Sequence, residues 1–274
     1  MARTSVRIVR VPSVLALSLS TALALTATAC GSGKADSGGK TANENGSTPV
    51  VVATTTWEGA LAKAAGAKDV KVIVPSSVQH APDYDPKPSD LAAVADADFV
   101  LYASFEPYAK KIKDAAGSSA KMVEVDLDNG ADKASAEVMR LGKLFGTQRA
   151  AAKWDTSFKS EYGTLQKGLR TAWPGGKAPA VVAQVFSVWS ARMAGAELRG
   201  TYGPQAVTAK QLSDLEKKKP AYVLDNVHMT TGTVLPDSGA KQVEIVNYPG
   251  KDLDLMAVYK NAAETIKKAM ASSA

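Results

Sequence analysis

The sequence predicts an α/β protein of two lobes, each a small sheet flanked by helices, joined by a long backbone helix. Three observations lead to this prediction. From about residue 50, short runs rich in β-branched residues alternate with helical stretches, as they do in α/β folds. Over about residues 134–172 the alternation stops, and apolar residues recur at helical spacing without any proline. After that stretch the alternation resumes and continues almost to the C-terminus.

The N-terminal lobe is expected over residues 50–133. Its predicted elements, in order, are a strand at 50–53, a helix at 57–65, a strand at 70–74, a Pro-rich loop at 75–88, a helix from about residue 89, and strands at 99–102 and 122–125. Ser89 and Asp90 favour a helix start because their side-chain oxygens accept hydrogen bonds from the first free backbone N–H groups.

The connecting helix is expected over residues 134–173, either as one helix or as two in succession. Its apolar side chains recur at helical spacing and are Val138, Leu141, Leu144, Phe145, Trp154, Phe158, Tyr162, Leu165 and Leu169. A helix of about 25 residues is on the order of 40 Å long, which is enough to connect two lobes.

The C-terminal lobe is expected over residues 174–274. Its predicted elements are a strand at 180–185, a helix from about residue 187, a helix at 209–219, strands at 221–224 and 242–246, and a final helix at 255–270. The segment 200–204, which contains two glycines and a proline, is interpreted as a turn.

Composition and charge indicate a folded domain and argue against a nucleic-acid partner. The chain has 274 residues, 45% of them hydrophobic, which is enough to bury a substantial core. Its formal charge is +6, but Arg3, Arg7 and Arg10 lie in a segment that we expect to be removed, which leaves 30 basic against 27 acidic residues. The lysines are scattered along amphipathic stretches, as on solvated helix faces, rather than clustered with aromatic residues.

The N-terminal 29 residues are typical of a signal peptide. Three arginines precede an apolar run at residues 11–25, and small residues follow it up to Cys30. A resident membrane helix is the alternative, but it needs about 20 apolar residues, and this run is shorter and is interrupted by Pro12. Export of the chain is therefore predicted.

Cys30 is the only cysteine of the chain, so no disulfide can form within it. The sequence Ala27-Thr28-Ala29-Cys30-Gly31 resembles the lipobox of bacterial lipoproteins. This resemblance implies cleavage before Cys30 and lipidation of its side chain, with the protein anchored to the outer face of the cell membrane. Residues 30–49 are polar and rich in Gly and Ser, so we interpret them as a flexible tether.

Several stretches resemble the cluster A (TroA/ZnuA-like) solute-binding lipoproteins, which deliver zinc, manganese or iron to ABC importers. Tyr84-Asp85-Pro86-Lys87-Pro88-Ser89-Asp90 resembles a motif of that family, and the passages at 95–100, 105–108, 217–224 and 259–261 resemble others. The resemblance spans about residues 50–270. It implies a monomeric receptor that works with an ABC permease and its ATPase and takes a transition-metal ion as the transported ligand, without an organic cofactor.

The expected metal site departs from the family pattern. The family has a histidine two residues before the motif tyrosine, where this chain has Pro82, and the nearest histidine is His80. The second family histidine has no counterpart near 126–129. The resemblance places Gln184 at the third ligand position and Asn247 approximately at the fourth.

The predicted metal ligands are therefore His80, Gln184, His228 and Asn247, and secondary candidates are Asp83, Asp85, Asp225, Asn226 and Met229. Imidazole and carboxylate are common ligands of transition metals, and imidazole with thioether suits a softer ion such as copper. The alternative for each histidine is an ordinary surface residue, and for the methionine it is packing.

Aromatic residues near these positions favour a second ligand class. They are Trp57, Tyr84, Phe186, Trp189 and Tyr248. With the amides they suit a metal chelate or another small solute, although core packing is the simpler explanation for any one of them.

An enzymatic function has little support, since the chain lacks a Gly-x-Ser-x-Gly elbow, a His-Glu-x-x-His pair and a phosphate-binding Gly-rich loop. A surface adhesin with a decayed metal site is a further alternative.

Overall fold

The computed structural model describes residues 49–78, 80–230 and 232–271, all of which belong to one compact unit. The predicted signal peptide, Cys30 and residues 30–48 of the predicted tether lie outside the described residues. No helix in the described part of the chain is long and apolar enough to cross a membrane.

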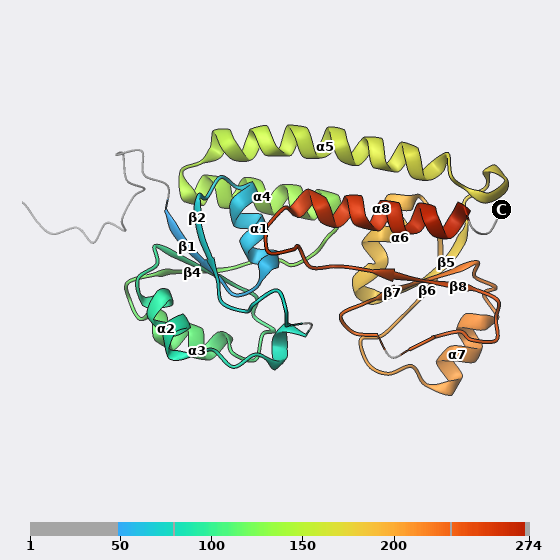
Figure 1. Ribbon diagram of the computed structural model, residues 1–274, viewed down its shortest axis with the longest axis horizontal. Helices are drawn as coiled ribbons and strands as arrows, with labels where there is room; N and C mark the ends of the chain where they lie inside the picture. Colours follow the sequence, from blue (N-terminus) through green and yellow to red (C-terminus); the bar gives the residue numbers. More distant parts are fainter. Residues whose placement is uncertain (1–48, 79, 231, 272–274) are drawn as a thin grey trace, which may run out of the picture. The chain divides into compact units, whose positions relative to one another are not determined.

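Each lobe contains a parallel four-stranded sheet (Figure 1). In the first lobe the order is β2-β1-β3-β4, with β1 at Val50–Ala53, β2 at Asp69–Val72, β3 at Phe99–Tyr102 and β4 at Lys121–Glu124. In the second lobe it is β6-β5-β7-β8, with β5 at Ala180–Gln184, β6 at Glu197–Tyr202, β7 at Tyr222–Asn226 and β8 at Lys241–Ile245. The two sheets thus repeat one strand order, and the predicted α/β two-lobed fold is confirmed.

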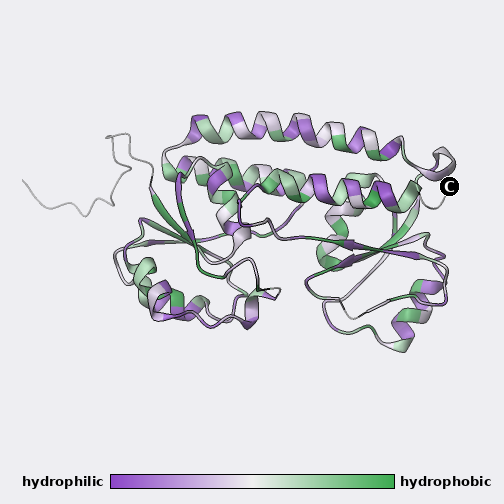
Figure 2. Ribbon diagram, in the orientation of Figure 1, coloured by the Kyte–Doolittle hydropathy of each residue, from purple (hydrophilic) through white to green (hydrophobic). Residues whose placement is uncertain are grey.

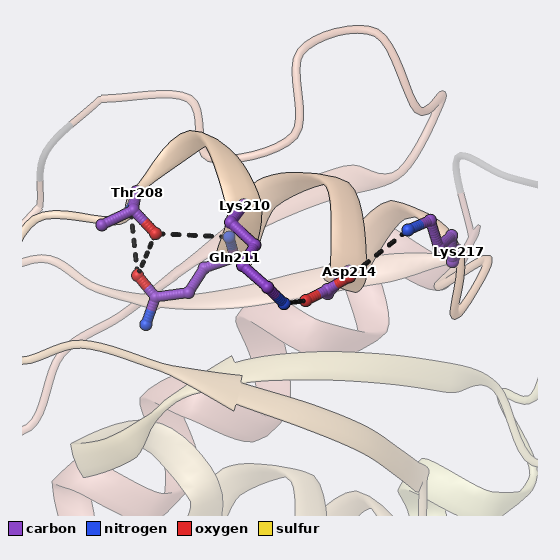
Figure 3. Close-up of polar contacts among 5 residues, drawn as sticks. All are labelled: Thr208, Lys210, Gln211, Asp214 and Lys217. Atoms are coloured by element: carbon purple, nitrogen blue, oxygen red, sulfur yellow. Dashed lines mark hydrogen bonds and ion pairs between the residues drawn. The ribbon is translucent and has the colours of Figure 1, made fainter.

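Short helices flank both sheets. They are α1 at Thr56–Ala64, α2 at Pro88–Ala95 and α3 at Ala109–Ala116 in the first lobe, and α6 at Val188–Ala194 and α7 at Ala209–Glu216 in the second. Three-residue 3₁₀ turns lie at Ala81–Asp83, Pro174–Gly176 and Val185–Ser187. The start of α7 is capped reciprocally by Thr208 and Gln211, and Asp214 pairs with Lys210 and Lys217 along the helix (Figure 3).

The long stretch between the lobes forms two helices, α4 at Ala131–Phe145 and α5 at Gln148–Arg170. The break occurs at Gly146, whose left-handed conformation ends α4. Helix α4 packs on α1, whereas α5 contacts α4, α6 and the last helix, α8 at Leu255–Ala271. Figure 1 shows α5 running beside α4 and α8, so α5 is the helix that links the two lobes.

One hydrophobic core spans residues of both lobes. It includes Val51 and Leu101 from the first sheet and Val181 and Leu224 from the second. Hydrophilic and hydrophobic residues alternate along α5 (Figure 2), because only one face of this helix is covered. An aromatic cluster fixes that face, with the Tyr259 ring of α8 5.1 Å from Phe158 and 5.6 Å from Tyr162 of α5 (centroid to centroid), and 5.3 Å from Trp189 of α6.

The interpretation of residues 200–204 as a turn is wrong for its first half, because Gly200–Tyr202 completes β6. This strand lies at the edge of its sheet and is mostly exposed, so its sequence lacks the buried apolar pattern that identifies inner strands. Helix α3 was not predicted either, although its apolar residues Ile112 and Ala116 lie four positions apart on one face.

Candidate ligand-binding site

A cavity of about 280 Å³ lies at the carboxyl ends of strands from both lobes. Ligands of parallel α/β sheets bind at this end of the strands. Segments that follow β1 and β2 line it from the first lobe, and segments that follow β7 and β8 line it from the second. The lining residues are Thr55, Thr56, Val74, Pro75, Ser76, Val78, Ala81, His228, Val246, Tyr248, Pro249, Gly250 and Lys251.

Tyr248 joins the two walls of this cavity. Its ring centroid lies 5.5 Å from that of Trp57 on α1 and 4.7 Å from that of His228, both in edge-to-face arrangements. The loop that carries His228 is shaped by Asn226, whose side-chain oxygen accepts a hydrogen bond of 3.1 Å from the His228 backbone N–H. His228 and Tyr248 are the predicted site residues that line the cavity, and Trp57 packs against Tyr248.

Two buried carboxyl groups lie close to Tyr248. Glu58 is fully buried on α1, where its Oε2 accepts hydrogen bonds from the Thr55 backbone N–H at 3.1 Å and from the Thr55 hydroxyl. Glu106 follows β3 and accepts from the Ala103 backbone N–H and the Tyr108 hydroxyl, each at 3.1 Å. The remaining Glu58 oxygen, Oε1, has no hydrogen-bond partner among the described residues.

The electrostatics of this pair follow from burial and proximity. Burial, and then the charge of Glu58, raise the pKa of Glu106 to about 8. Burial also raises the pKa of Glu58. The pKa of Tyr248 is raised by burial and then by the charges of both carboxyl groups. Two such carboxyl groups cannot both be ionised at neutral pH, so the pair retains a proton.

The two amides predicted as ligands use their oxygens within the protein. Gln184 Oε1 accepts a hydrogen bond of 2.6 Å from the Phe186 backbone N–H, and Asn247 Oδ1 accepts one of 2.9 Å from the Trp189 indole N–H. Both amide nitrogens are buried, and neither has a hydrogen-bond partner in the described part of the chain. Asn129 donates to the backbone oxygen of Asn247 at 3.0 Å, while its own Oδ1 also lacks a partner among the residues described.

The other predicted residues of the first lobe lie outside the cavity. His80 Nδ1 is 3.0 Å from Asp83 Oδ1, and the two side chains are 41% and 77% exposed to solvent, respectively. Asp85 forms an exposed ion pair of 2.9 Å with Lys111. The Tyr84 hydroxyl donates to Asp90 at 2.8 Å, which fixes the motif loop against the start of α2.

In the second lobe, Asp225 is buried and accepts hydrogen bonds from the Tyr202 hydroxyl at 2.7 Å and from the Gln242 side chain at 3.4 Å. Met229 follows the His228 loop and is half-buried, and the Phe186 ring is 49% exposed. Of the four predicted ligands, His228 alone is among the residues that line the cavity. Within residues 49–78, 80–230 and 232–271, no three His, Cys, Asp or Glu side chains gather as they would around a metal ion.

Sequence reasoning did not identify Glu58, Glu106 or Asn129 as residues near the site. Glu58 had a local signal, because Thr55-x-x-Glu58 is the pattern of a helix-capping box. Glu106 lies in one of the family-like passages, but nothing in the sequence shows that β1 and β3 bring it beside Glu58.

Two parallel sheets joined by a long helix, with a cavity between their carboxyl ends, make up the two-lobed architecture of this chain. The sequence profile of the family ZnuA, described as zinc-uptake complex component A, periplasmic, matches residues 51–150. Over these residues the match confirms the resemblance that the sequence motifs predicted. No curated protein sequence matches the chain.

Several solved structures share this fold. The laminin-binding protein Lbp of Streptococcus pyogenes aligns with a TM-score of 0.57 and 16% identity over 80% of this chain and 99% of that one. FpvC of Pseudomonas aeruginosa, in complex with Mn²⁺, aligns with a TM-score of 0.60 and 14% identity over 82% of this chain and 98% of that one. A zinc-bound deletion mutant of ZnuA aligns with a TM-score of 0.58 and 17% identity over 81% of this chain and 98% of that one.

Proposed function

We propose that this chain is the solute-binding component of an ABC importer and that it captures a transition-metal ion, bare or chelated, in the cavity between its lobes. The cavity itself carries the proposal, because it is lined by both lobes at the ends of the strands where α/β proteins bind ligands. The family profile over residues 51–150 and the metal named for two similar structures support a metal as the transported species.

His228 is the predicted ligand that this proposal favours most. Its imidazole lines the cavity and packs against Tyr248, so a bound ion would lie between the lobes. His80, Gln184 and Asn247 are given no direct contact with the ion in this proposal, because none of them lines the cavity and both amide oxygens are bonded within the protein. The role is one of capture and release rather than catalysis.

The proposal extends to the N-terminus. Cleavage before Cys30 and its lipidation would place the receptor on the outer face of the cell membrane, with residues 30–49 as a tether. There a permease and its ATPase would accept the solute. Labelling cells with a lipid precursor, in the native chain and in Cys30→Ala, tests this part separately, since only the native chain should take up the label.

Surface adhesion is the second candidate, because two of the similar structures are named laminin-binding proteins and one of them is described as both adhesin and metal transporter. A solid-phase binding assay with laminin separates the two functions. Binding of laminin without any binding of metal would favour adhesion.

The main test is a thermal-shift titration of the purified full-length protein with zinc, manganese, iron, copper and nickel. One ion should raise the melting temperature because it binds the folded state alone. The shift should be lost in His228→Ala and largely kept in His80→Ala, which serves as the matched histidine control. If no metal or metal chelate changes the melting temperature, the proposed function is wrong.

A further inference from the structure

We infer that Glu58, Glu106 and Thr54 form a second ion site, beneath the cavity, for a hard divalent cation of the class of Mg²⁺, Mn²⁺ and Ca²⁺. This inference goes beyond the proposed function, because the site is distinct from the cavity that His228 lines. It starts from two buried carboxyl groups that lie side by side and from two buried oxygen atoms without a hydrogen-bond partner among the described residues.

Two neighbouring strands end beside each other in the first lobe. Ala53 of β1 is the partner of Leu101 of β3 in the parallel register. Thr55 and Ala103 each follow two residues later, so their backbone N–H groups lie at the same edge of the sheet. Adjacent strands are about 4.8 Å apart, so two side chains that bind these N–H groups lie close together.

Glu58 and Glu106 are the side chains that do so. Glu58 Oε2 accepts from the Thr55 N–H and Glu106 Oε2 accepts from the Ala103 N–H, each at 3.1 Å. Burial and then the charge of Glu58 raise the pKa of Glu106, which agrees with this proximity. None of the ion pairs between described residues includes either carboxyl group. Within the described part of the chain, the pair therefore has no cationic side chain to balance it.

Two oxygen atoms beside the pair point to a ligand. Glu58 Oε1 and Thr54 Oγ1 have no hydrogen-bond partner in the described part of the chain, although both side chains are 0% exposed. Burial raises the pKa of both carboxyl groups, and the Thr54 hydroxyl is among the groups that lower it again, so this hydroxyl is directed toward both. Buried oxygens without a partner are destabilising, and a bound cation would remove that penalty.

The available atoms define the class of ion, because all of them are oxygens. Hard cations such as Mg²⁺, Mn²⁺ and Ca²⁺ prefer oxygen ligands, whereas zinc and copper favour imidazole and sulfur. Two carboxylates balance the charge of one divalent ion, which would replace the proton that the pair retains. Each carboxylate oxygen can accept more than one contact, so the existing hydrogen bonds of Glu106 leave room for the ion. The third ligand is a hydroxyl, so the site agrees with the finding that no three His, Cys, Asp or Glu side chains cluster among the residues described.

The site lies directly behind the wall of the cavity. Thr55 lines the cavity, and its hydroxyl donates to Glu58 Oε2. Glu58 and Glu106 are 0% and 4% exposed, and neither is part of the lining. An ion that enters the cavity would reach the pair past Thr55. In this water-poor position its attraction to the carboxylates is stronger than it would be at the surface.

Titration of the purified full-length protein with MgCl₂, MnCl₂ and CaCl₂ tests the inference. Isothermal calorimetry measures binding of all three, and electron paramagnetic resonance measures the loss of free Mn²⁺. We expect one of these ions to bind. Glu58→Gln should weaken its binding about tenfold or more, because it removes a charge but keeps an oxygen for the Thr55 N–H. Glu161→Gln, in an exposed ion pair with Lys260, is the charge-matched control and should bind the ion as the native protein does.

Thr54→Val gives a second test that keeps the shape of the side chain. The hydroxyl that it removes has no partner among the described residues, so the ion-free protein should keep its melting temperature. Binding of the ion should nevertheless weaken about tenfold, and Thr54→Ser should restore it. Thr156→Val on the exposed side of α5 is the matched control.

His228→Ala separates the two sites, since it removes the ligand proposed for the cavity. Ion binding that survives in His228→Ala but is weakened in Glu58→Gln and Thr54→Val supports the inference. Binding that is lost in His228→Ala and kept in the other two variants would place the ion in the cavity, which would overturn the inference and leave the proposed function intact. If none of the three ions binds the native protein, the carboxyl pair holds only a proton and the inference is wrong, while the titration with zinc, iron, copper and nickel still decides the proposed function.

Discussion

The indole N–H of Trp189 donates a hydrogen bond of 2.9 Å to the side-chain oxygen of Asn247. The backbone oxygen of Asn247 accepts from the Asn129 side chain at 3.0 Å, and the backbone oxygen of Asn129 accepts from the Tyr259 hydroxyl at 3.1 Å. Asn129 lies between β4 and α4, and Asn247 lies between β8 and α8. This network therefore joins the β4–α4 connection to the β8–α8 connection, and it bonds both of them to helices of the second lobe through Trp189 of α6 and Tyr259 of α8.

Trp189→Phe should lower the free energy of unfolding by about 1–3 kcal/mol, because Asn247 Oδ1 would lose its donor while remaining buried. Urea denaturation followed by circular dichroism measures this loss. Trp154→Phe on α5 is the control, since it makes the same reduction in ring size at a less buried position. Equal losses in the two variants would show that ring area, and not the hydrogen bond, determines the effect.

The Glu58–Glu106 pair should make the protein less stable as the pH rises from about 4.5 to about 8. Between the ordinary pKa of 4.5 and the raised pKa of about 8, folded Glu106 holds a proton that the unfolded chain releases. The folded state then binds more protons, so the free energy of unfolding falls with pH, by at most about 1.4 kcal/mol per pH unit for one proton.

Urea midpoints measured at several pH values across this window test that prediction. Glu106→Gln should flatten the slope because it removes the titrating group. Glu161→Gln is the control, since Glu161 is solvent-exposed in its ion pair with Lys260 and should leave the slope unchanged. A native protein whose midpoint rises steadily from pH 5 to pH 8 would contradict the assigned direction.

Gly142→Ala should destabilise the fold, because a Cβ atom there would lie 2.4 Å from the Cβ of Ala151 where α4 and α5 approach each other. Overpacking of this kind costs about 1–3 kcal/mol. Gly163→Ala on α5 is the matched control, as nothing lies within 4 Å of its added Cβ. That variant should gain roughly 0.5–1 kcal/mol from helix propensity. Thermal unfolding of the two variants should therefore move in opposite directions from the native protein.

Thr208→Ala should lower the free energy of unfolding by about 1 kcal/mol, because its hydroxyl accepts from the Gln211 backbone N–H at the start of α7 (Figure 3). Thr156→Ala is the control, since that exposed hydroxyl donates within α5 to the Ala152 oxygen and caps no helix end. Denaturant titrations of both variants provide the comparison. A loss confined to Thr156→Ala would refute the capping role of Thr208.

Most of the fold could be predicted from the sequence, because apolar runs and helical spacing of apolar residues identify strands and helices within a few neighbouring positions. The inner strands show buried apolar runs such as Val50–Ala53 and Phe99–Tyr102, and both were predicted at their observed bounds. The edge strand Glu197–Tyr202 could not be predicted in this way, since its side chains face solvent and its glycine suggests a turn. The predicted motif loop at Tyr84 was correctly placed before a helix that begins at Pro88.

Less of the site could be predicted. His228 and Tyr248 were selected by residue type, and both line the cavity. His80 was selected for the same reason, yet its ring lies outside the lining and faces Asp83. Residue type states which chemistry a side chain can perform, but it does not state where the side chain lies.

The sequence by itself determined the α/β class, the helical link between two lobes and the residue types available for binding, because periodicity and composition act over a few neighbouring residues. Only the tertiary structure decided that Glu58, Glu106 and Tyr248 lie together, although Tyr248 is far from the other two along the chain. It also decided that the side-chain oxygens of Asn247 and Gln184 accept hydrogen bonds within the protein, whereas their side-chain nitrogens have no partner among the described residues. Such contacts depend on strand order and on long-range packing, which no local pattern encodes.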